Sequence, residues 1–212
     1  MSSYRRSFFK KLGMLMGGYW GGSSRAAAAT EPHLTTSASG PQTSSEEPIR
    51  GQYDLIVVGG GILGTAAAIS AARNGVKVAL IHERSMLGGN SSSEVKLFPE
   101  NNPAIHPWIR ESGIHDEFHT EERSRNHFHF LAGTMNAHWD LVLYEWVIRE
   151  PNITLFLDTH MHRVQMKDRA HIESVYCIQL GTEKSFQLGA NLFVDATGTG
   201  IMGQRWISMS PF

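Results

Sequence analysis

Asp54-Leu-Ile-Val-Val58-Gly59-Gly60-Gly61-Ile62-Leu63-Gly64 is the stretch that decides the fold of this 212-residue chain. The uncharged, β-branched run that follows Asp54 predicts a buried strand, and it leads directly into a glycine-rich turn. An Ala-rich segment from Ile62 to Asn74 predicts a helix, which ends where Gly75 favours a C-terminal cap. A strand, a Gly-x-Gly-x-x-Gly turn and a helix in this order are typical of a dinucleotide-binding unit.

The three spaced glycines of this turn have separate expected roles. Gly59 permits the tight turn, Gly61 lets the backbone approach a pyrophosphate, and Gly64 lets the helix lie close to the strand. Ile62 and Leu63 form the first turn of the helix. Because the N-terminus of a helix carries free N–H groups and the positive end of the dipole, these residues are expected to face the phosphates.

An acidic residue completes the unit. A second strand is predicted from Val76 to Ile81, and Glu83 follows it, nineteen residues after Gly64. A carboxylate at this place can accept hydrogen bonds from both hydroxyls of an adenosine ribose. The sequence therefore predicts a bound nucleotide; the alternative is a glycine-rich turn without a ligand.

The residues after Glu83 favour FAD over NAD. About seventy residues separate Glu83 from the next strong strand, Asn152 to Leu157, whereas a simple nicotinamide domain continues at once with another helix and strand. This insertion opens with a second glycine- and hydroxyl-rich turn, Arg84-Ser-Met-Leu-Gly88-Gly89-Asn90-Ser91-Ser92-Ser93. A later strand ends in a third turn of small residues, Leu192-Phe-Val-Asp195-Ala196-Thr197-Gly198-Thr199-Gly200.

With these three motifs in this order, residues 53 to 200 resemble the FAD-dependent oxidoreductases of the glutathione-reductase-like superfamily. The resemblance implies an α/β fold with a Rossmann-like parallel sheet, helices on both faces and an inserted small antiparallel β-meander. It also implies FAD as the cofactor, which accepts a hydride from an unidentified organic substrate. Thr199 stands where relatives usually carry Asp. The expected cofactor-binding residues are Gly59, Gly61, Ile62, Leu63, Gly64, Glu83, Arg84, Gly88, Gly89, Asn90, Ser91 and Gly198.

Two other functions stay open on the sequence: an NAD(P)-binding dehydrogenase domain and a non-catalytic nucleotide-binding fragment. The first lacks support because the chain has no Tyr-x-x-x-Lys pair. The second is favoured by the twelve residues that follow Gly200, which show no core-forming pattern. We expect a C-terminally truncated chain, with an incomplete FAD-binding domain over residues 53–203 and an irregular tail over 204–212.

The segments between the motifs predict the remaining elements. The apolar stretch from His138 to Glu150 predicts a helix that packs on the sheet and ends at Pro151. Short alternating segments between Met161 and Leu188 predict the antiparallel meander, which precedes a last strand from Leu192 to Asp195.

The first residues resemble a twin-arginine export signal. Tyr4-Arg5-Arg6-Ser7-Phe8-Phe9-Lys10-Lys11 precedes a short apolar run and an Ala-x-Ala cleavage pattern at Ala26–Ala29. The apolar run is too short to span a bilayer, which needs about 20 apolar residues. We expect residues 1–29 to be a signal peptide, residues 30–52 to be a disordered linker, and the protein to be exported to the bacterial periplasm. Export of folded cargo by the twin-arginine machinery agrees with a cofactor that binds the folded protein.

Charge and cysteine content exclude other functions. Without residues 1–29 the chain has 14 Lys and Arg against 20 Asp and Glu, a net charge of −6, because five basic and no acidic residues lie in that segment. Such a chain is not expected to bind nucleic acid through its phosphates, and its expected partners are a small-molecule substrate and the export machinery. Cys177 is the only cysteine, which excludes an internal disulfide and favours a buried, small hydrophobic role.

The other polar clusters predict no second site. The pairs His127/His129 and His160/His162 have spacings compatible with a metal but lack further ligands, so structural or surface roles are expected. Asp116, Glu117, Glu121 and Glu122 predict a solvated helix face. Ser91 to Ser93 are expected to donate hydroxyls to phosphate, because no Gly-x-Ser-x-Gly elbow surrounds them. The sequence assigns no catalytic acid or base; His106 and His115 are the candidate proton carriers, because histidine can titrate near neutral pH.

Overall fold

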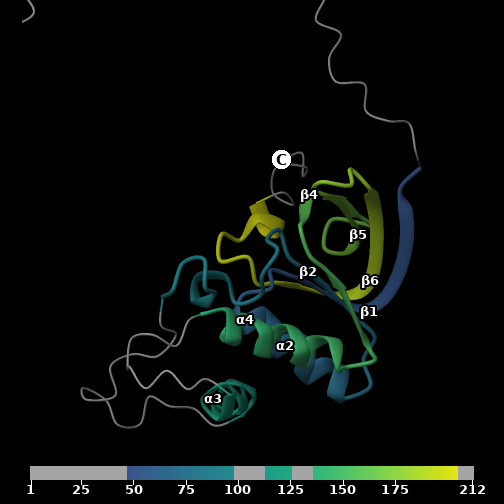
Figure 1. Cartoon of the computed structure of the whole chain (residues 1–212). Coiled ribbons are helices and arrows are strands. Elements are labelled where there is room, and N and C mark those ends of the chain that lie inside the picture. The colour runs from purple at the N-terminus through teal and green to yellow at the C-terminus, as the bar shows by residue number, and fades with distance from the viewer. Residues whose placement is uncertain (1–46, 98–112, 126–135, 205–212) are drawn as a thin grey trace, which may run out of the picture. The chain divides into compact units, whose positions relative to one another are not determined.

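The computed structural model describes residues 47–97, 113–125 and 136–204, and these form one six-stranded sheet with helices (Figure 1). The order of the strands is β3-β2-β1-β6-β5-β4. Parallel pairing joins the first four strands in this order, and antiparallel pairing joins the last three. The strands are β1 (Ile49–Val58), β2 (Val78–Ile81), β3 (Ile153–Phe156), β4 (Thr159–Met166), β5 (Ile172–Gln179) and β6 (Ser185–Asp195). The expected α/β class with a Rossmann-like parallel sheet is confirmed.

The helices predicted over Ile62–Asn74 and His138–Glu150 are present and begin and end close to the expected residues. They are α2 (Ile62–Arg73), α3 (Ile114–Arg125), α4 (Ala137–Ile148) and the single 3₁₀ turn η1 (Gly89–Ser91). Gly75 follows α2 with a φ of 82°, as expected for a C-terminal glycine. Asn136 caps the start of α4, because its side chain accepts hydrogen bonds from the backbone N–H groups of His138 and Trp139.

Two cores lie on the two faces of the sheet. Val57 of β1 packs with residues of α2 and α4, such as Ile69 and Leu143, in a helix-side core. The neighbouring side chains Ile56 and Val58 point to the opposite face and pack in a meander-side core. Successive residues of a strand point to opposite faces, so β1 supplies both cores.

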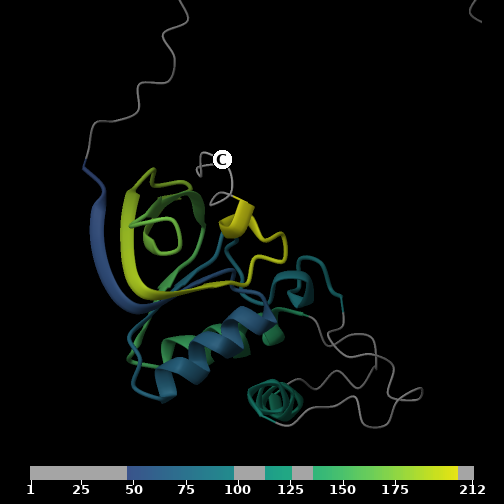
Figure 2. The same cartoon turned by 180° about the vertical axis from the view of Figure 1, so that it is seen from behind.

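Among the described residues, helices cover mainly one face of the sheet, whereas helices on both faces were expected. Figures 1 and 2 show α2 and α4 on one face, while β4 and β5 curl over the other. Buried meander residues such as Val164, Val175 and Leu188 fill that second face. Among the described residues, the meander covers most of the apolar side of β1 and β2 on this face, and the helical turn at residues 201–204 adds Met202 to the same core.

Two strand boundaries also differ. The strand expected from Leu192 to Asp195 is only the second half of β6, whose first half pairs with β5. β1 starts at Ile49, so residues 49–52 belong to the sheet and not to the expected linker. Pairing with β6 from Ile49↔Phe186 to Tyr53↔Ala190 supplies the backbone hydrogen bonds that order this part of the chain.

No helix among the described residues is long and apolar enough to cross a membrane.

Candidate nucleotide-binding site

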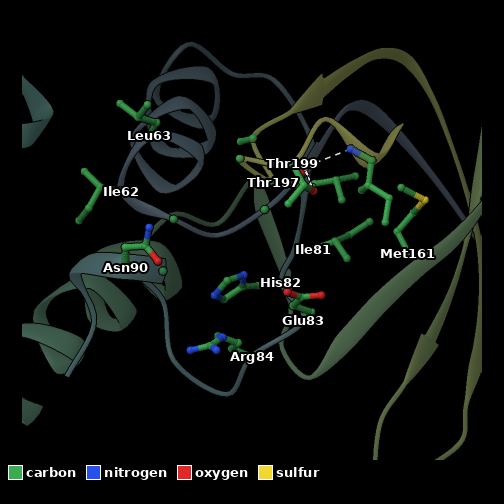
Figure 3. A pocket seen from close by; sticks show the side chains of 18 of the residues that line it. Ile62, Leu63, Ile81, His82, Glu83, Arg84, Asn90, Met161, Thr197 and Thr199 are labelled. Atoms are coloured by element: carbon green, nitrogen blue, oxygen red, sulfur yellow. Dashed lines mark hydrogen bonds between the residues drawn. The ribbon is translucent and has the colours of Figure 1, made fainter. Parts of the chain in front are cut away.

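A cleft of about 450 Å³ opens at the carboxyl ends of β1, β2 and β6, where ligands bind in open α/β sheets (Figure 3). Figure 3 shows Glu83 and Arg84 beyond the end of β2, Asn90 on the neighbouring turn, and Thr197 and Thr199 on the last turn. The cleft collects all the expected site residues except Gly64. The lining therefore includes Gly59, Gly61, Ile62, Leu63, Glu83, Arg84, Gly88, Gly89, Asn90, Ser91 and Gly198.

Two glycines of the first turn are required by packing. Gly59 has a φ of 108°, and a Cβ there would lie 2.4 Å from the carbonyl oxygen of Ala196. A Cβ on Gly64 would lie 1.8 Å from the carbonyl oxygen of Gly59. The expected close approach of the helix to the strand at Gly64 is confirmed. Gly64 is packed against the backbone of Gly59 and therefore does not line the cleft.

Gly61 is different, because neither its backbone nor its neighbours require glycine. Its φ of −65° suits any residue, and a Cβ there would meet no atom within 4 Å. Gly61 also caps the N-terminus of α2 without a side chain, so the free N–H groups of the first turn are open to the cleft. This arrangement leaves room for an anionic group against the backbone.

The second glycine-rich turn rests on the first. The Gly88 N–H donates to the Gly60 carbonyl oxygen at 2.8 Å, and a Cβ on Gly89 would lie 3.2 Å from the Gly61 Cα. Both Gly88 and Gly89 have positive φ angles, of 104° and 58°, which glycine adopts without strain. The two motifs of the sequence thus form one continuous wall of backbone.

The hydroxyl cluster of this turn is smaller than expected. Ser91 lines the cleft, but Ser92 is 0% exposed and does not line it. The backbone N–H of Ser93 donates to the Asp140 Oδ1 atom at 2.9 Å, which anchors the end of the turn on α4. Only Ser91 of the three serines is therefore in a position to contact a ligand in the cleft.

Glu83 and Arg84 both have partners that the sequence did not predict. The Glu83 Oε2 atom lies 3.4 Å from the His160 Nδ1 atom on β4, and both side chains stay partly exposed. The Arg84 Nη1 atom lies 2.6 Å from the Glu94 Oε2 atom, so the charge of Arg84 is balanced within the protein. Glu83 and His160 are far apart in the sequence, and Arg84 and Glu94 lie in an irregular segment. No periodic pattern in the sequence therefore indicates either pair.

The last turn is organised by Asp195, which the sequence did not single out. Its carboxylate accepts hydrogen bonds from the Thr197 hydroxyl at 2.6 Å, the Thr197 N–H at 3.1 Å and the Met202 N–H at 3.0 Å. Burial alone would raise the pKa of Asp195, but these hydrogen bonds outweigh burial and lower the pKa. The anionic Asp195 thereby orders the turn that carries Gly198.

His82 is a second site residue that the sequence did not predict. It follows β2 directly, lines the cleft and is 7% exposed. The Gly60 N–H donates to its Nδ1 atom at 3.0 Å. A lone histidine at a strand end carries no signal in the sequence, because its role depends on the glycine turn that folding brings beside it.

The structure corrects one of the remaining expectations, leaves one open and confirms one. Glu122 is 1% exposed, so the acidic run is not a fully solvated face; Glu122 follows buried Phe118 by one helical turn of α3. His115 lies beside His119 on α3 and does not line this cleft as the described residues form it, and its expected role as a proton carrier stays a prediction. Cys177 is buried in β5, as expected.

The histidine pairs give no metal centre in the described part of the chain. No group of three or more His, Cys, Asp or Glu side chains there is placed to hold a metal ion. His106, His127 and His129 lie outside the described residues.

Comparisons with known proteins extend this description. The sequence profile of the family described as FAD dependent oxidoreductase matches residues 54–205. The glycerol-3-phosphate dehydrogenase of Mycobacterium leprae (strain TN) is 39% identical over 75 residues, which are 34% of this chain and 13% of that protein. The aerobic glycerol-3-phosphate dehydrogenase of Staphylococcus aureus (strain USA300) is 44% identical over 46 residues, 22% of this chain and 8% of that protein.

A solved structure, Mycobacterium smegmatis Sdh1 in complex with UQ1, resembles the fold with a TM-score of 0.51 and 15% identity. The match covers 70% of this chain and 34% of that one, and at this identity it shows the fold alone. The chain thus spans only a small share of the length of these relatives. The family match over residues 54–205 covers more than half of the sequence, and the chain therefore belongs to the FAD dependent oxidoreductase family.

Proposed function

We propose that the cleft holds the ADP half of FAD against the two glycine-rich turns. The observation that carries this proposal is Gly61, where a side chain would project into the cleft although nothing in the fold excludes one. Gly61 and the N-terminus of α2 accommodate the diphosphate, and Glu83 accepts hydrogen bonds from the ribose hydroxyls. Arg84 and the turn from Gly88 to Ser91 lie along the diphosphate towards the flavin, and Gly198 lies beside the cofactor on the last turn.

Calorimetry with FAD, ADP and NAD tests this assignment. We expect FAD and ADP to bind and Glu83→Gln to weaken both by roughly ten- to a hundredfold, the loss typical of hydrogen bonds to a charged group. The matched control is Glu173→Gln, an exposed carboxylate on β5 outside the cleft, which is expected to bind as the wild type does. Equal affinity in the Glu83 variant, or preference for NAD, contradicts the proposal.

We infer further that the cofactor accepts a hydride from an organic substrate. Bound FAD supplies the electron-accepting ring, and the protein orients the ring and excludes water. The described residues that line the cleft offer backbone amides, hydroxyl groups and the side chains of Glu83, Arg84 and Asn90 for binding. Reduction of an artificial electron acceptor by the FAD-loaded protein, screened over alcohols, amines and hydroxy acids, tests for turnover; loading without turnover of any substrate favours a non-catalytic nucleotide-binding role.

The glutathione-reductase-like subtype is part of this proposal. It is supported by the order β3-β2-β1-β6, by the antiparallel β4-β5 pair that precedes β6, and by the three turns at one end of the sheet. A cofactor that stays bound through gel filtration, with the spectrum of oxidised flavin, is the expected property of such a site.

We propose that the protein is exported by the twin-arginine route to the bacterial periplasm. The support is the sequence of residues 4–11 and the alanines at 26–29. Replacement of both Arg5 and Arg6 by lysine is expected to leave the protein in the cytoplasm with its precursor length, as followed by cell fractionation. Cleavage and export of this double variant at the wild-type level contradict the proposal.

A further inference from the structure

His82 is fixed at the junction of the sheet and the cleft. Its backbone N–H donates to the Phe156 carbonyl at 2.8 Å, and its carbonyl accepts from the Thr159 N–H at 2.9 Å. These bonds tie the residue to the chain on the β3 and β4 side. Its side chain reaches the opposite way, to the Gly60 N–H in the middle of the first glycine turn, at 3.0 Å.

This contact reaches both glycine turns. The Gly60 carbonyl accepts the Gly88 N–H at 2.8 Å and the Thr65 hydroxyl at 3.2 Å. The backbone of one residue, Gly60, thus joins His82 through its N–H to α2 and the second turn through its carbonyl. The ring also packs against the turn, because a Cβ on Gly60 would lie 2.8 Å from the His82 Cγ. A change in the His82 ring therefore acts on the cleft wall directly.

The hydrogen bond requires one protonation state of the ring. An imidazole nitrogen accepts an N–H only when it carries no proton, so the proton of neutral His82 sits on Nε2. The Nε2 atom is buried and has no hydrogen-bond partner of normal geometry among the described residues, and the Met86 backbone favours a proton on the ring. The Gly60 N–H is thus the contact that selects this tautomer, and a second proton on Nδ1 would face the Gly60 N–H and break the bond.

We propose that neutral His82 is a positioning residue that holds the first glycine turn in its FAD-binding shape, and that protonation of His82 releases the turn and weakens FAD binding. This inference rests on the proposed function of the cleft. FAD binding is then linked to a proton. At acid pH the protonated ring favours a state in which the Gly60 N–H is displaced, and at neutral pH the unprotonated ring favours the state that binds FAD.

The charges around the ring set the pH range. Burial lowers the pKa of His82, against smaller raising effects of the Met86 backbone and the Glu83 and Glu94 carboxylates, while Arg84 lowers it. Residues 59–61 of the turn carry no titratable side chain, and the β3–β4 side contributes Asp158 and His160. Because the folded protein has the lowered pKa, the binding shape is complete at and above the ordinary histidine value of about 6.5 and is lost only as the pH falls through the lowered pKa.

Two substitutions separate the roles of the acceptor and of its titration. His82→Asn keeps an acceptor oxygen close to the place of Nδ1 but does not titrate; we expect near wild-type FAD affinity at about pH 8 and no additional loss at about pH 5.5. His82→Leu leaves the buried Gly60 N–H without a partner, so we expect affinity to fall about fivefold or more at both pH values. The wild type is expected to lose FAD affinity as the pH falls from about 8 to about 5.5 and below, through the lowered pKa of His82.

Two further histidine variants serve as controls. His171→Asn changes an exposed histidine in the connection between β4 and β5 and is expected to keep the wild-type affinities. His160→Gln removes the titratable partner of Glu83, and we expect it to keep the wild-type ratio of the two affinities. Loss of the pH dependence in the His160 variant, or its persistence in His82→Asn, overturns the inference.

A measurement on the protein without cofactor tests the role of His82 independently of the proposed FAD binding. In ¹⁵N-labelled protein at about pH 8, His82 is expected to show a protonated Nε2 and an unprotonated Nδ1, and the Gly60 amide shift is expected to follow its titration. The opposite tautomer, or a Gly60 amide that ignores the titration, overturns the inference even if FAD binds. Failure of the wild type to bind FAD at any pH, with the His82–Gly60 coupling present, refutes the proposed function instead.

Discussion

A methyl group added at Gly61 or at Gly64 meets opposite surroundings, although the two residues are three positions apart. At Gly61 it enters open space in the cleft, whereas at Gly64 it strikes the Gly59 carbonyl. We expect Gly61→Ala to keep the wild-type free energy of unfolding and to lose FAD affinity by more than about tenfold, because the methyl group would occupy the place proposed for the diphosphate. We expect Gly64→Ala to destabilise the fold by more than about 2 kcal/mol.

Chemical denaturation and FAD titration of the same two variants check this pair. A Gly61 variant that binds FAD like the wild type contradicts the diphosphate assignment. A Gly64 variant with unchanged stability contradicts the packing role.

The Cys177 thiol is expected to be inert in the folded protein. Burial raises its pKa to about 12, so almost no thiolate is present near neutral pH. We expect no reaction with a disulfide reagent at about pH 8 until the protein is unfolded, and then one thiol per chain. Rapid labelling under native conditions contradicts the burial.

The sequence predicts site residues that belong to one short motif. It does not predict residues that reach the site only because folding brings distant parts of the chain together. Gly59, Gly61 and Glu83 follow from a spacing within one βαβ unit. His82 gains its role only from a hydrogen bond to Gly60, twenty-two positions away. Asp195 acts through its contacts with the turn that follows it, which a strand pattern does not encode.

At the level of elements, α4 depends on its first residue. The Asn136 side chain accepts the His138 N–H at 3.0 Å and the Trp139 N–H at 3.4 Å. We expect Asn136→Ala to lower the free energy of unfolding by about 1 kcal/mol, because the first turn of the helix loses its cap. Asn136→Asp retains an acceptor and is expected to restore most of this loss, as measured by urea denaturation; equal destabilisation of both variants contradicts the capping role.

The elements themselves were largely predictable, since apolar periodicity and helix stop signals mark α2, α4 and the strands. The two errors of extent have a common cause. The segment Ile49–Gln52 is mixed in polarity and becomes a strand because residues 186–189 pair with it, and β6 runs from its pairing with β5 into its pairing with β1 without a break. Long-range pairing of this kind leaves no local pattern from which a strand end can be read.

For the whole molecule, the two cores are expected to unfold together. Ile69 lies in the helix-side core and Leu188 in the meander-side core, and both cores include residues of β1 and β2. We expect Ile69→Ala and Leu188→Ala each to destabilise by about 2–5 kcal/mol, and each to shift one common transition.

Urea denaturation followed by both tryptophan fluorescence and circular dichroism measures this cooperativity. Two of the five tryptophans, Trp139 and Trp146, lie on α4. Fluorescence therefore reports the helix side once Trp20, Trp108 and Trp206 are replaced by phenylalanine in every protein compared, while the far-ultraviolet signal includes the strands. Coincident curves for the wild type and both variants are the expected result. Separate transitions in either variant contradict a single cooperative unit.

The contact between Gly60 and Gly88 has a consequence for engineering. Because the second turn leans on the backbone of the first, neither loop is an independent module that can be grafted alone into another scaffold. A chimaera that exchanges only residues 59–64 would lose the support that Leu87 and Gly88 now find there, and a chimaera that exchanges only residues 84–93 would leave Gly60 facing a foreign loop. Transplanting the specificity of this cleft therefore requires both loops and the histidine between them to move as one piece.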